Sequence, residues 1–188
     1  MKISIYKTLL GLLWLTGGIV MSTSCNKKLT EYNPTGLTAS TITANARMFE
    51  SLVNAVYSYN RFWYGKEEGY SVWEMGTDIW TNGTGDVYPQ LTRYDNLQGS
   101  NTPALTLIWN NIYAAINLCN MGITHVGAVP DMTAALKTTR EAELRFLRAF
   151  YFYHVVETWG GVHFTTVPNE GYQTEAIRKP VDSFYNQI

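Results

Sequence analysis

The feature that most constrains the fold is a long helical pattern that begins at Asp131 or Thr133 and stops at Gly160-Gly161. Apolar side chains recur along it at helical spacing, and further aromatic residues widen the stripe. The stripe contains Leu136, Leu144, Leu147, Tyr151 and Val155, and the residues that widen it are Phe146, Phe150 and Tyr153. A helix with so wide an apolar face must be covered on several sides. The pattern therefore predicts a mainly α fold in which helices pack on helices.

Two other segments show the same periodicity. The first runs from about Thr43 to Tyr59, with Thr41 or Thr43 as its cap. Its stripe is Phe49, Leu52, Val53, Val56 and Tyr57. The second helix is expected over Leu105–Ile123, and Cys119 on its apolar face is expected to be a buried free thiol. Strand signals are few, and the best of them is Val162–Val167.

The last residues of the sequence predict the start of one more helix. Pro180 stands near its first position, which suits proline, and its face is Val181, Phe184, Tyr185 and Ile188. A native chain rarely stops where an apolar helical face has just begun. We therefore expect residues 41–188 to be the N-terminal part of a longer helical domain.

The N-terminus has the features of an export signal. Lys2 and Lys7 precede an apolar run over Thr8–Val20, which is too short to span a bilayer. The small residues that follow lead directly into Cys25, and this arrangement resembles a bacterial lipoprotein signal, although Ser22 stands where leucine is usual. Residues 1–24 are then the signal peptide, Cys25 carries the lipid, and residues 25–40 form a tether. The alternative is an ordinary secreted protein that is cleaved nearby.

Charge excludes some partners. The full sequence has a formal net charge of −1, and removing residues 1–24 takes away two lysines and makes it −3. No basic excess exists to neutralise phosphates, so nucleic-acid binding is not expected. A basic patch for anionic lipid is missing as well, which leaves acyl chains on Cys25 as the membrane anchor.

Residues 65–103 break the helical pattern with scattered glycines and prolines, and they predict a long, irregular, aromatic-rich insertion. Aromatic rings here alternate with amides, carboxylates and guanidinium groups. Rings pack against the C–H faces of sugars while the polar groups match hydroxyls, although peptide binding and simple packing of the rings remain alternatives. The residues that we expect to bind ligand are Trp73, Asp78, Trp80, Asn82 and Arg93.

Catalytic signatures are weak. The sequence contains no P-loop, nucleophile elbow or zinc-protease motif. His154 and Glu157 form an i, i+3 pair that could belong to a metal site, but a polar seam on a packed helix explains them more simply. The insertion also holds four carboxylates, at Glu67, Glu68, Glu74 and Asp78, and two carboxylates on either side of a sugar could hydrolyse it. Solvated surface acids are the simpler interpretation, so we expect no enzyme activity, no cofactor and no metal.

Three motifs resemble one known family. Residues 142–153 read AELRFLRAFYFY and residues 159–162 read WGGV. This resembles the SusD/RagB family, whose hallmark is a helix of the form AEARFLRAFYYF leading to WGDVPL; here Gly161 replaces the Asp and His163-Phe164 the Pro-Leu. Residues 109–120, WNNIYAAINLCN, are similar to the helix that precedes it in the family. Arg178 and the helix start at 181–188 are similar to the next one.

The resemblance implies more than the residue patterns do. Members of this family are surface-exposed outer-membrane lipoproteins that capture nutrients, mostly glycans. They form a lid on a SusC-like TonB-dependent transporter, and their fold is a tetratricopeptide-like helical scaffold with an irregular remainder that carries the ligand surface. The resemblance thus implies an oligosaccharide-binding lipoprotein at the cell surface. A glycoside hydrolase and a purely structural helical scaffold are the alternatives.

Overall fold

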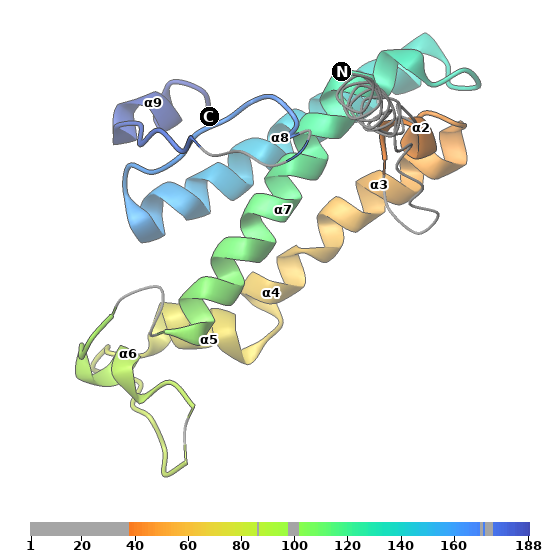
Figure 1. Ribbon diagram of the computed structural model, residues 1–188. Helices are drawn as coiled ribbons and strands as arrows, with labels where there is room; N and C mark the ends of the chain where they lie inside the picture. Colours follow the sequence, from red (N-terminus) through yellow and green to blue (C-terminus); the bar gives the residue numbers. More distant parts are fainter. Residues whose placement is uncertain (1–37, 86, 98–101, 170, 172–174) are drawn as a thin grey trace, which may run out of the picture. The chain divides into compact units, whose positions relative to one another are not determined.

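The computed structural model describes residues 38–85, 87–97, 102–169, 171 and 175–188. Within these ranges the chain is helical and contains no β-strand (Figure 1), so the mainly α prediction is confirmed. The elements are α2 (Ala39–Ile42), α3 (Ala46–Ser58), α4 (Asn60–Tyr64), α5 (Glu67–Glu74), α6 (Pro89–Arg93), α7 (Pro103–His125), η2 (Val126–Ala128), α8 (Ala134–Trp159) and α9 (Val181–Tyr185). The expected signal peptide, Cys25 and all but the last residues of the tether lie outside the described ranges.

The long helix α7 is the centre of the packing. It contacts α2, α3, α4, α5 and α8, and it runs between α3 and α8 in Figure 1. Buried side chains from all three long helices form one core, which includes Phe49, Leu52, Ile112, Leu144 and Leu147. Cys119 lies in this core, as predicted, and burial raises the pKa of its thiol to about 12.

A glycine permits the close crossing of these helices. A Cβ added at Gly122 of α7 would lie 2.5 Å from Leu144 Cδ1 of α8 and 2.9 Å from Leu52 Cδ2 of α3. Such distances are shorter than van der Waals contact, so a larger residue here would force the Leu144 and Leu52 side chains to shift.

Helix ends follow capping rules. The Thr133 side chain accepts a hydrogen bond from Leu136 N and caps α8, as one of the two expected residues. The prediction for α3 was wrong, because its cap is Asn45, whose Oδ1 accepts from Met48 N at 2.9 Å, and neither Thr41 nor Thr43. Asparagine is as good a cap as threonine, and it lies where the helix actually begins.

Most residues of the predicted apolar stripes are buried in the structure, but some of them are exposed. Phe49, Leu52, Val53 and Val56 are buried in α3, and Leu144, Leu147, Tyr151 and Val155 are buried in α8. Tyr57 is 43% exposed, Tyr153 43% and Phe146 67%, so these three were wrongly assigned to the core. Phe146 and Tyr153 are seven residues apart and therefore lie on the same side of α8.

Three further expectations differ from the structure. Residues 65–103 are not wholly irregular, because α5, α6 and the first residue of α7 lie within them. Val162–Val167 forms no strand; its only pairing is an isolated antiparallel bridge between His163 and Arg178. The final helix, α9, buries Phe184 against Phe152 and Phe164, whereas Val181, Tyr185 and Ile188 are exposed.

No helix in the described ranges is both long and apolar enough to cross a membrane.

Candidate functional site

The segment between α5 and α6 carries three of the expected ligand-binding residues, Asp78, Trp80 and Asn82, whereas Trp73 lies in α5 and Arg93 in α6. A small cluster of buried side chains, Tyr88, Leu91 and Ala104, packs with Val72 and Met75 and holds α5, α6 and the start of α7 together. The Tyr94 hydroxyl donates a hydrogen bond to the Gly76 carbonyl and joins the two ends of the segment. Gly76 has φ of +83°, and an added Cβ would lie 2.7 Å from the Tyr94 ring, so this closure requires glycine. The segment is thereby fixed at both ends.

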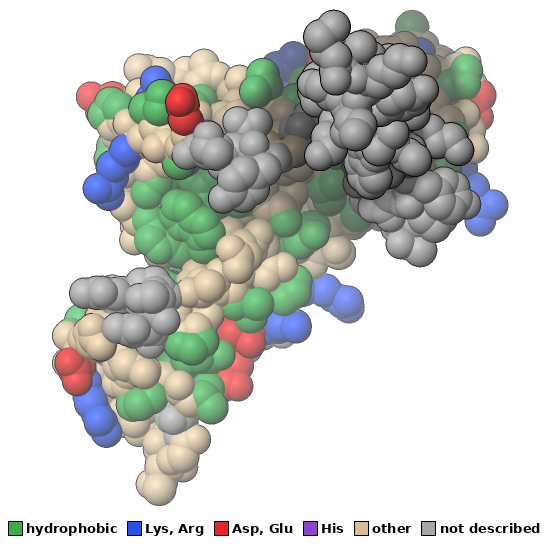
Figure 2. All heavy atoms as spheres, viewed as in Figure 1, with side chains coloured by type: hydrophobic (Ala, Val, Ile, Leu, Met, Phe, Trp, Pro, Cys, Tyr) green, Lys and Arg blue, Asp and Glu red, His purple; other side chains and the backbone are tan. Residues whose placement is uncertain are grey.

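Trp80 lines a hollow of about 530 Å³. The rest of its wall comes mainly from α5, and the residues are Glu67, Tyr70, Ser71, Met75, Thr81 and Gly83. Trp80 is 47% exposed and Tyr70 is 50% exposed, so two aromatic rings are accessible beside one carboxylate. In Figure 2, hydrophobic side chains reach the surface over α5 and α6 next to acidic ones. This arrangement can hold a ligand that has both an apolar face and hydrogen-bond donors.

Asn82 and Arg93 line a second, shallower hollow of about 390 Å³ together with Gly83, Thr84, Gly85 and Pro89. Gly83 borders both hollows, so the structure brings Trp80, Asn82 and Arg93 to one continuous stretch of surface. Arg93 is exposed and makes no ion pair with any described residue. Its guanidinium is therefore available to a ligand from the side of α6.

Trp73 and Asp78 are placed differently. Asp78 is exposed and lines neither hollow. The Trp73 ring lies 5.1 Å from that of Trp63 and 5.9 Å from that of His154, which belongs to α8. It is 47% exposed but lines neither of the two hollows. The structure therefore does not bring Trp73 and Trp80 into one hollow, although they are close in sequence.

His154 is the centre of this second aromatic cluster. Its ring lies 4.6 Å from those of both Trp63 and Phe150, and its Nε2 is 2.9 Å from the Tyr64 hydroxyl. Burial lowers the pKa of His154 to about 4, so the imidazole is neutral at pH 7. Glu157, its predicted i, i+3 partner, is exposed, and no group of metal-binding side chains occurs among the described residues. The pair therefore gives no support to a metal centre.

Carboxylates are sparse around the Trp80 hollow. Of the four acidic residues weighed as catalytic, Glu67 is the one that lines it, and Glu68, Glu74 and Asp78 do not. Hydrolysis of a glycosidic bond needs a pair of carboxyl groups on opposite sides of that bond. The described walls of this hollow thus supply one member of such a pair.

Sequence reasoning missed Ser71, Met75, Thr81 and Gly83 as neighbours of Trp80. Ser71 and Met75 are four residues apart, as expected for one face of a helix, but α5 is too short for its periodicity to stand out from the surrounding glycines. Only the packing of α5 against the following segment makes these residues a wall.

No known protein family, no curated protein and no solved structure matches this chain.

Proposed function

We propose that this protein is a non-catalytic, glycan-binding lipoprotein of the SusD type that captures oligosaccharide at the cell surface. The observation that carries the proposal is the surface formed by Trp80, Tyr70, Asn82 and Arg93. Exposed rings there adjoin amide, carboxylate and guanidinium groups across the two hollows that share Gly83. This is the chemistry that matches the apolar faces and the hydroxyl groups of a sugar chain.

The helical architecture supports the same proposal. The helix α7 packs against α3 on one side and α8 on the other, and the chain reverses direction between successive members of this set (Figure 1). Antiparallel helix pairs are the units of a tetratricopeptide-like scaffold. The motif-bearing helix α8 ends at the turn at Gly160-Gly161, and its packing on α7 is compatible with the structural role that we propose for the motif.

Membrane anchoring and delivery are part of the proposal. Lipid on Cys25 would hold the protein at the outer membrane, and the captured oligosaccharide would pass to a SusC-like TonB-dependent transporter. The exposed Phe146 and Tyr153 on α8 are apolar side chains of the kind that protein partners cover.

A Trp80→Ala variant tests the binding surface. Loss of one stacking ring should weaken binding by about 1–3 kcal/mol, a range taken by analogy from stacking on nucleic-acid bases, and should leave the fold intact. Isothermal titration with a panel of neutral oligosaccharides measures the affinity, and circular dichroism checks the fold.

The adjacent residue provides a matched control. Ile79 is 79% exposed and lines neither hollow, so Ile79→Ala should bind like the wild type. Equal affinities in folded Trp80→Ala and wild-type protein would place the site elsewhere. Release of reducing ends from the bound oligosaccharide would show that the protein is a hydrolase instead.

A further inference from the structure

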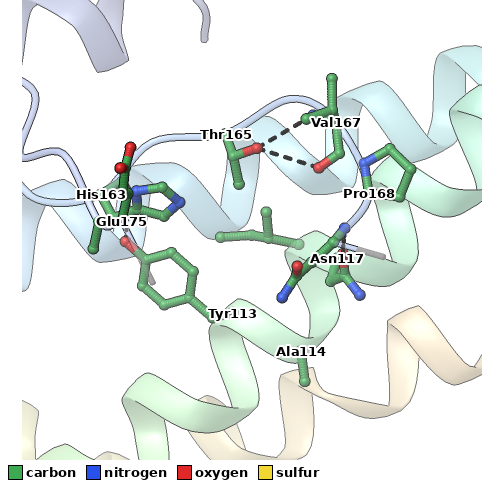
Figure 3. Close-up of a pocket in the computed structure, with 11 residues that line it drawn as sticks. Tyr113, Ala114, Asn117, His163, Thr165, Val167, Pro168 and Glu175 are labelled. Atoms are coloured by element: carbon green, nitrogen blue, oxygen red, sulfur yellow. Dashed lines mark hydrogen bonds between the residues drawn. The ribbon is translucent and has the colours of Figure 1, made fainter. Parts of the chain in front are cut away.

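One face of α7 lines two more hollows, away from the Trp80 surface. Leu105, Trp109, Tyr113 and Asn117 follow one another at intervals of four residues and therefore form one ridge of the helix. Leu105 and Trp109 line a hollow of about 370 Å³ with Trp159 of α8. Tyr113 and Asn117 line the next, of about 460 Å³ (Figure 3). At 1.5 Å per residue the ridge is roughly 18 Å long, which is the length of a short extended chain.

Aromatic rings connect the two hollows. The rings of Trp159 and Trp109 lie 5.2 Å apart and perpendicular, and those of Trp109 and Tyr113 lie 4.5 Å apart. The Tyr113 ring lies 6.5 Å from that of His163. We call this feature, from Trp159 to Asn117, the α7 groove. Rings in contact with one another link the two hollows, from Trp159 and Trp109 in the first to Tyr113 in the second.

The opposite wall of the larger hollow is fixed in place by side chains of the long helices. The Tyr113 hydroxyl donates to the His163 carbonyl at 2.6 Å, and Asn117 Oδ1 accepts from Asn169 N at 2.7 Å. Asn120 Nδ2 donates to the carbonyls of Thr165 and Val167. These bonds hold a segment without regular secondary structure against α7 and leave a hollow behind it.

A half-buried arginine reinforces this wall. Arg148 Nη1 of α8 donates to Asn120 Oδ1 at 2.8 Å and to the Thr166 carbonyl at 3.2 Å. Burial lowers the pKa of Arg148 from its ordinary value. The half-buried guanidinium thus holds the Asn120 side chain and the Thr166 carbonyl in place. The wall is therefore already ordered before a ligand binds, and binding does not have to order it.

The lining of the larger hollow defines the ligand. Eleven residues line it, and Glu175 is the one Asp, Glu, Lys or Arg side chain among them. Among the described residues, the ring nitrogens of His163 have no hydrogen-bond partner. Asn117 uses its Oδ1 in a hydrogen bond, but its Nδ2 donates none to a described residue. The hollow therefore offers a carboxylate, a carboxamide and an imidazole beside an aromatic ring, and its described lining includes no Lys or Arg to hold an anionic ligand.

We infer that the α7 groove is a second saccharide-binding site, which takes a neutral oligosaccharide with one sugar unit in the Tyr113–Asn117 hollow and the next units over Trp109 and Trp159. Both hollows lie within the range of volumes of small-ligand pockets. The inference rests on the proposed function only for the class of ligand, a saccharide. The location of the site is independent of that proposal, because the α7 groove and the Trp80 surface share no residue.

Filling the hollow tests the inference without removing a polar group. Ala114 lines the hollow, so Ala114→Phe should occupy the space of a sugar unit. Ala142 is an exposed alanine on α8, and Ala142→Phe is the matched control. Both changes are made in the Trp80→Ala background so that the remaining affinity reports the groove. Isothermal titration uses neutral hexasaccharides, with hexagalacturonate as an anionic probe and a neutral hexapeptide as a peptide probe.

The expected result is a loss of affinity of at least tenfold with Ala114→Phe, no change with Ala142→Phe, and no binding of hexagalacturonate. Unchanged affinity in a folded Ala114→Phe protein would overturn the inference, as would binding of the hexapeptide in place of the saccharides. If Ala114→Phe does not fold, Ala176→Phe fills the same hollow from an exposed position. A loss of affinity with Trp80→Ala but not with Ala114→Phe supports only the proposed function. A loss of affinity with Ala114→Phe but not with Trp80→Ala supports only the α7 groove.

Discussion

At the scale of single residues, His154 shows how an apolar environment changes a titratable group. Aromatic rings surround it on α8, and Tyr64 is its one hydrogen-bond partner among the described residues. Its Nδ1 is buried without a partner. Because the site disfavours the charged imidazolium, the pKa of His154 is lowered to about 4. The histidine therefore acts as a neutral packing residue at pH 7.

This pKa predicts a pH dependence of stability. Below about pH 6.5 the unfolded chain takes up a proton on this histidine and the folded chain does not until about pH 4. The neutral His154 therefore makes its full contribution to the free energy of unfolding above pH 6.5. This contribution declines as the pH falls, by up to about 3 kcal/mol. Urea denaturation between pH 7 and pH 4 should show a smaller decline for His154→Phe than for the wild type.

The control for this measurement is His125→Gln, which changes a histidine outside the aromatic cluster and should keep the wild-type profile. Identical pH profiles for His154→Phe and the wild type would show that His154 titrates normally in the folded protein.

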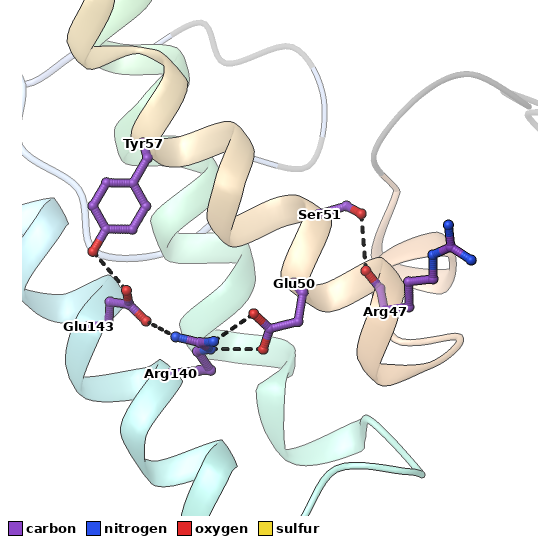
Figure 4. Close-up of polar contacts among 6 residues, drawn as sticks. All are labelled: Arg47, Glu50, Ser51, Tyr57, Arg140 and Glu143. Carbon is purple, nitrogen blue, oxygen red and sulfur yellow. Dashed lines mark hydrogen bonds and ion pairs between the residues drawn. The ribbon is translucent and has the colours of Figure 1, made fainter.

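At the scale of elements, polar contacts add to the apolar packing between α3 and α8. Arg140 of α8 donates to both carboxylate oxygens of Glu50 in α3, at 2.8 and 2.7 Å, and to Glu143 at 2.6 Å (Figure 4). The Tyr57 hydroxyl donates to Glu143 at 2.7 Å. Burial alone would raise the pKa of Glu143, but the hydrogen bonds from Tyr57 and Arg140 outweigh it and the pKa is lowered. The bidentate pair fixes the register of the two helices.

The apolar contacts dominate the energetics of α8. Leu147 is 2% exposed in the three-helix core, so Leu147→Ala should reduce the free energy of unfolding by roughly 2–5 kcal/mol. The adjacent Phe146 is 67% exposed, and Phe146→Ala should change the free energy of unfolding by less than about 0.5 kcal/mol. Chemical denaturation of both variants provides the comparison. A small effect of Leu147→Ala would contradict the assignment of this face to the core.

At the scale of the whole molecule, the proposed function gives the helical part and the N-terminal signal separate roles. No described helix can span a membrane, and in the proposed function the lipid on Cys25 provides the anchor. Multiple acyl chains give stable anchoring, whereas one chain alone gives only marginal binding.

The anchor predicts a fractionation experiment. Cys25→Ala should yield unprocessed precursor or soluble protein, while Cys119→Ala, which removes the buried thiol, should still be processed and remain with the outer membrane. Metabolic labelling with a fatty-acid analogue and membrane fractionation measure both properties. Processed Cys25→Ala protein in the membrane fraction would argue against lipidation at this position.

The sequence by itself determined the helices whose apolar stripes are long. The helices α7 and α8, the Thr133 cap, the stop at Gly160 and the buried Cys119 could all be predicted, because local periodicity and capping act within a few residues. Even here the sequence could not say which apolar residues are covered. Phe146 and Leu147 look equally apolar, and their burial depends on where α7 lies.

The tertiary structure alone decided the short elements and the two candidate surfaces. The helices α5 and α6 have too few turns to be stable or recognisable alone, and they exist because Val72, Tyr88 and Leu91 pack together. The same packing directs Trp80 into a hollow and leaves Trp73 against His154. The α7 groove depends on hydrogen bonds between residues that are 18 to 52 positions apart. Side chains so distant in sequence come into contact only after the long helices have packed, so no local sequence pattern predicts which of them will be in contact.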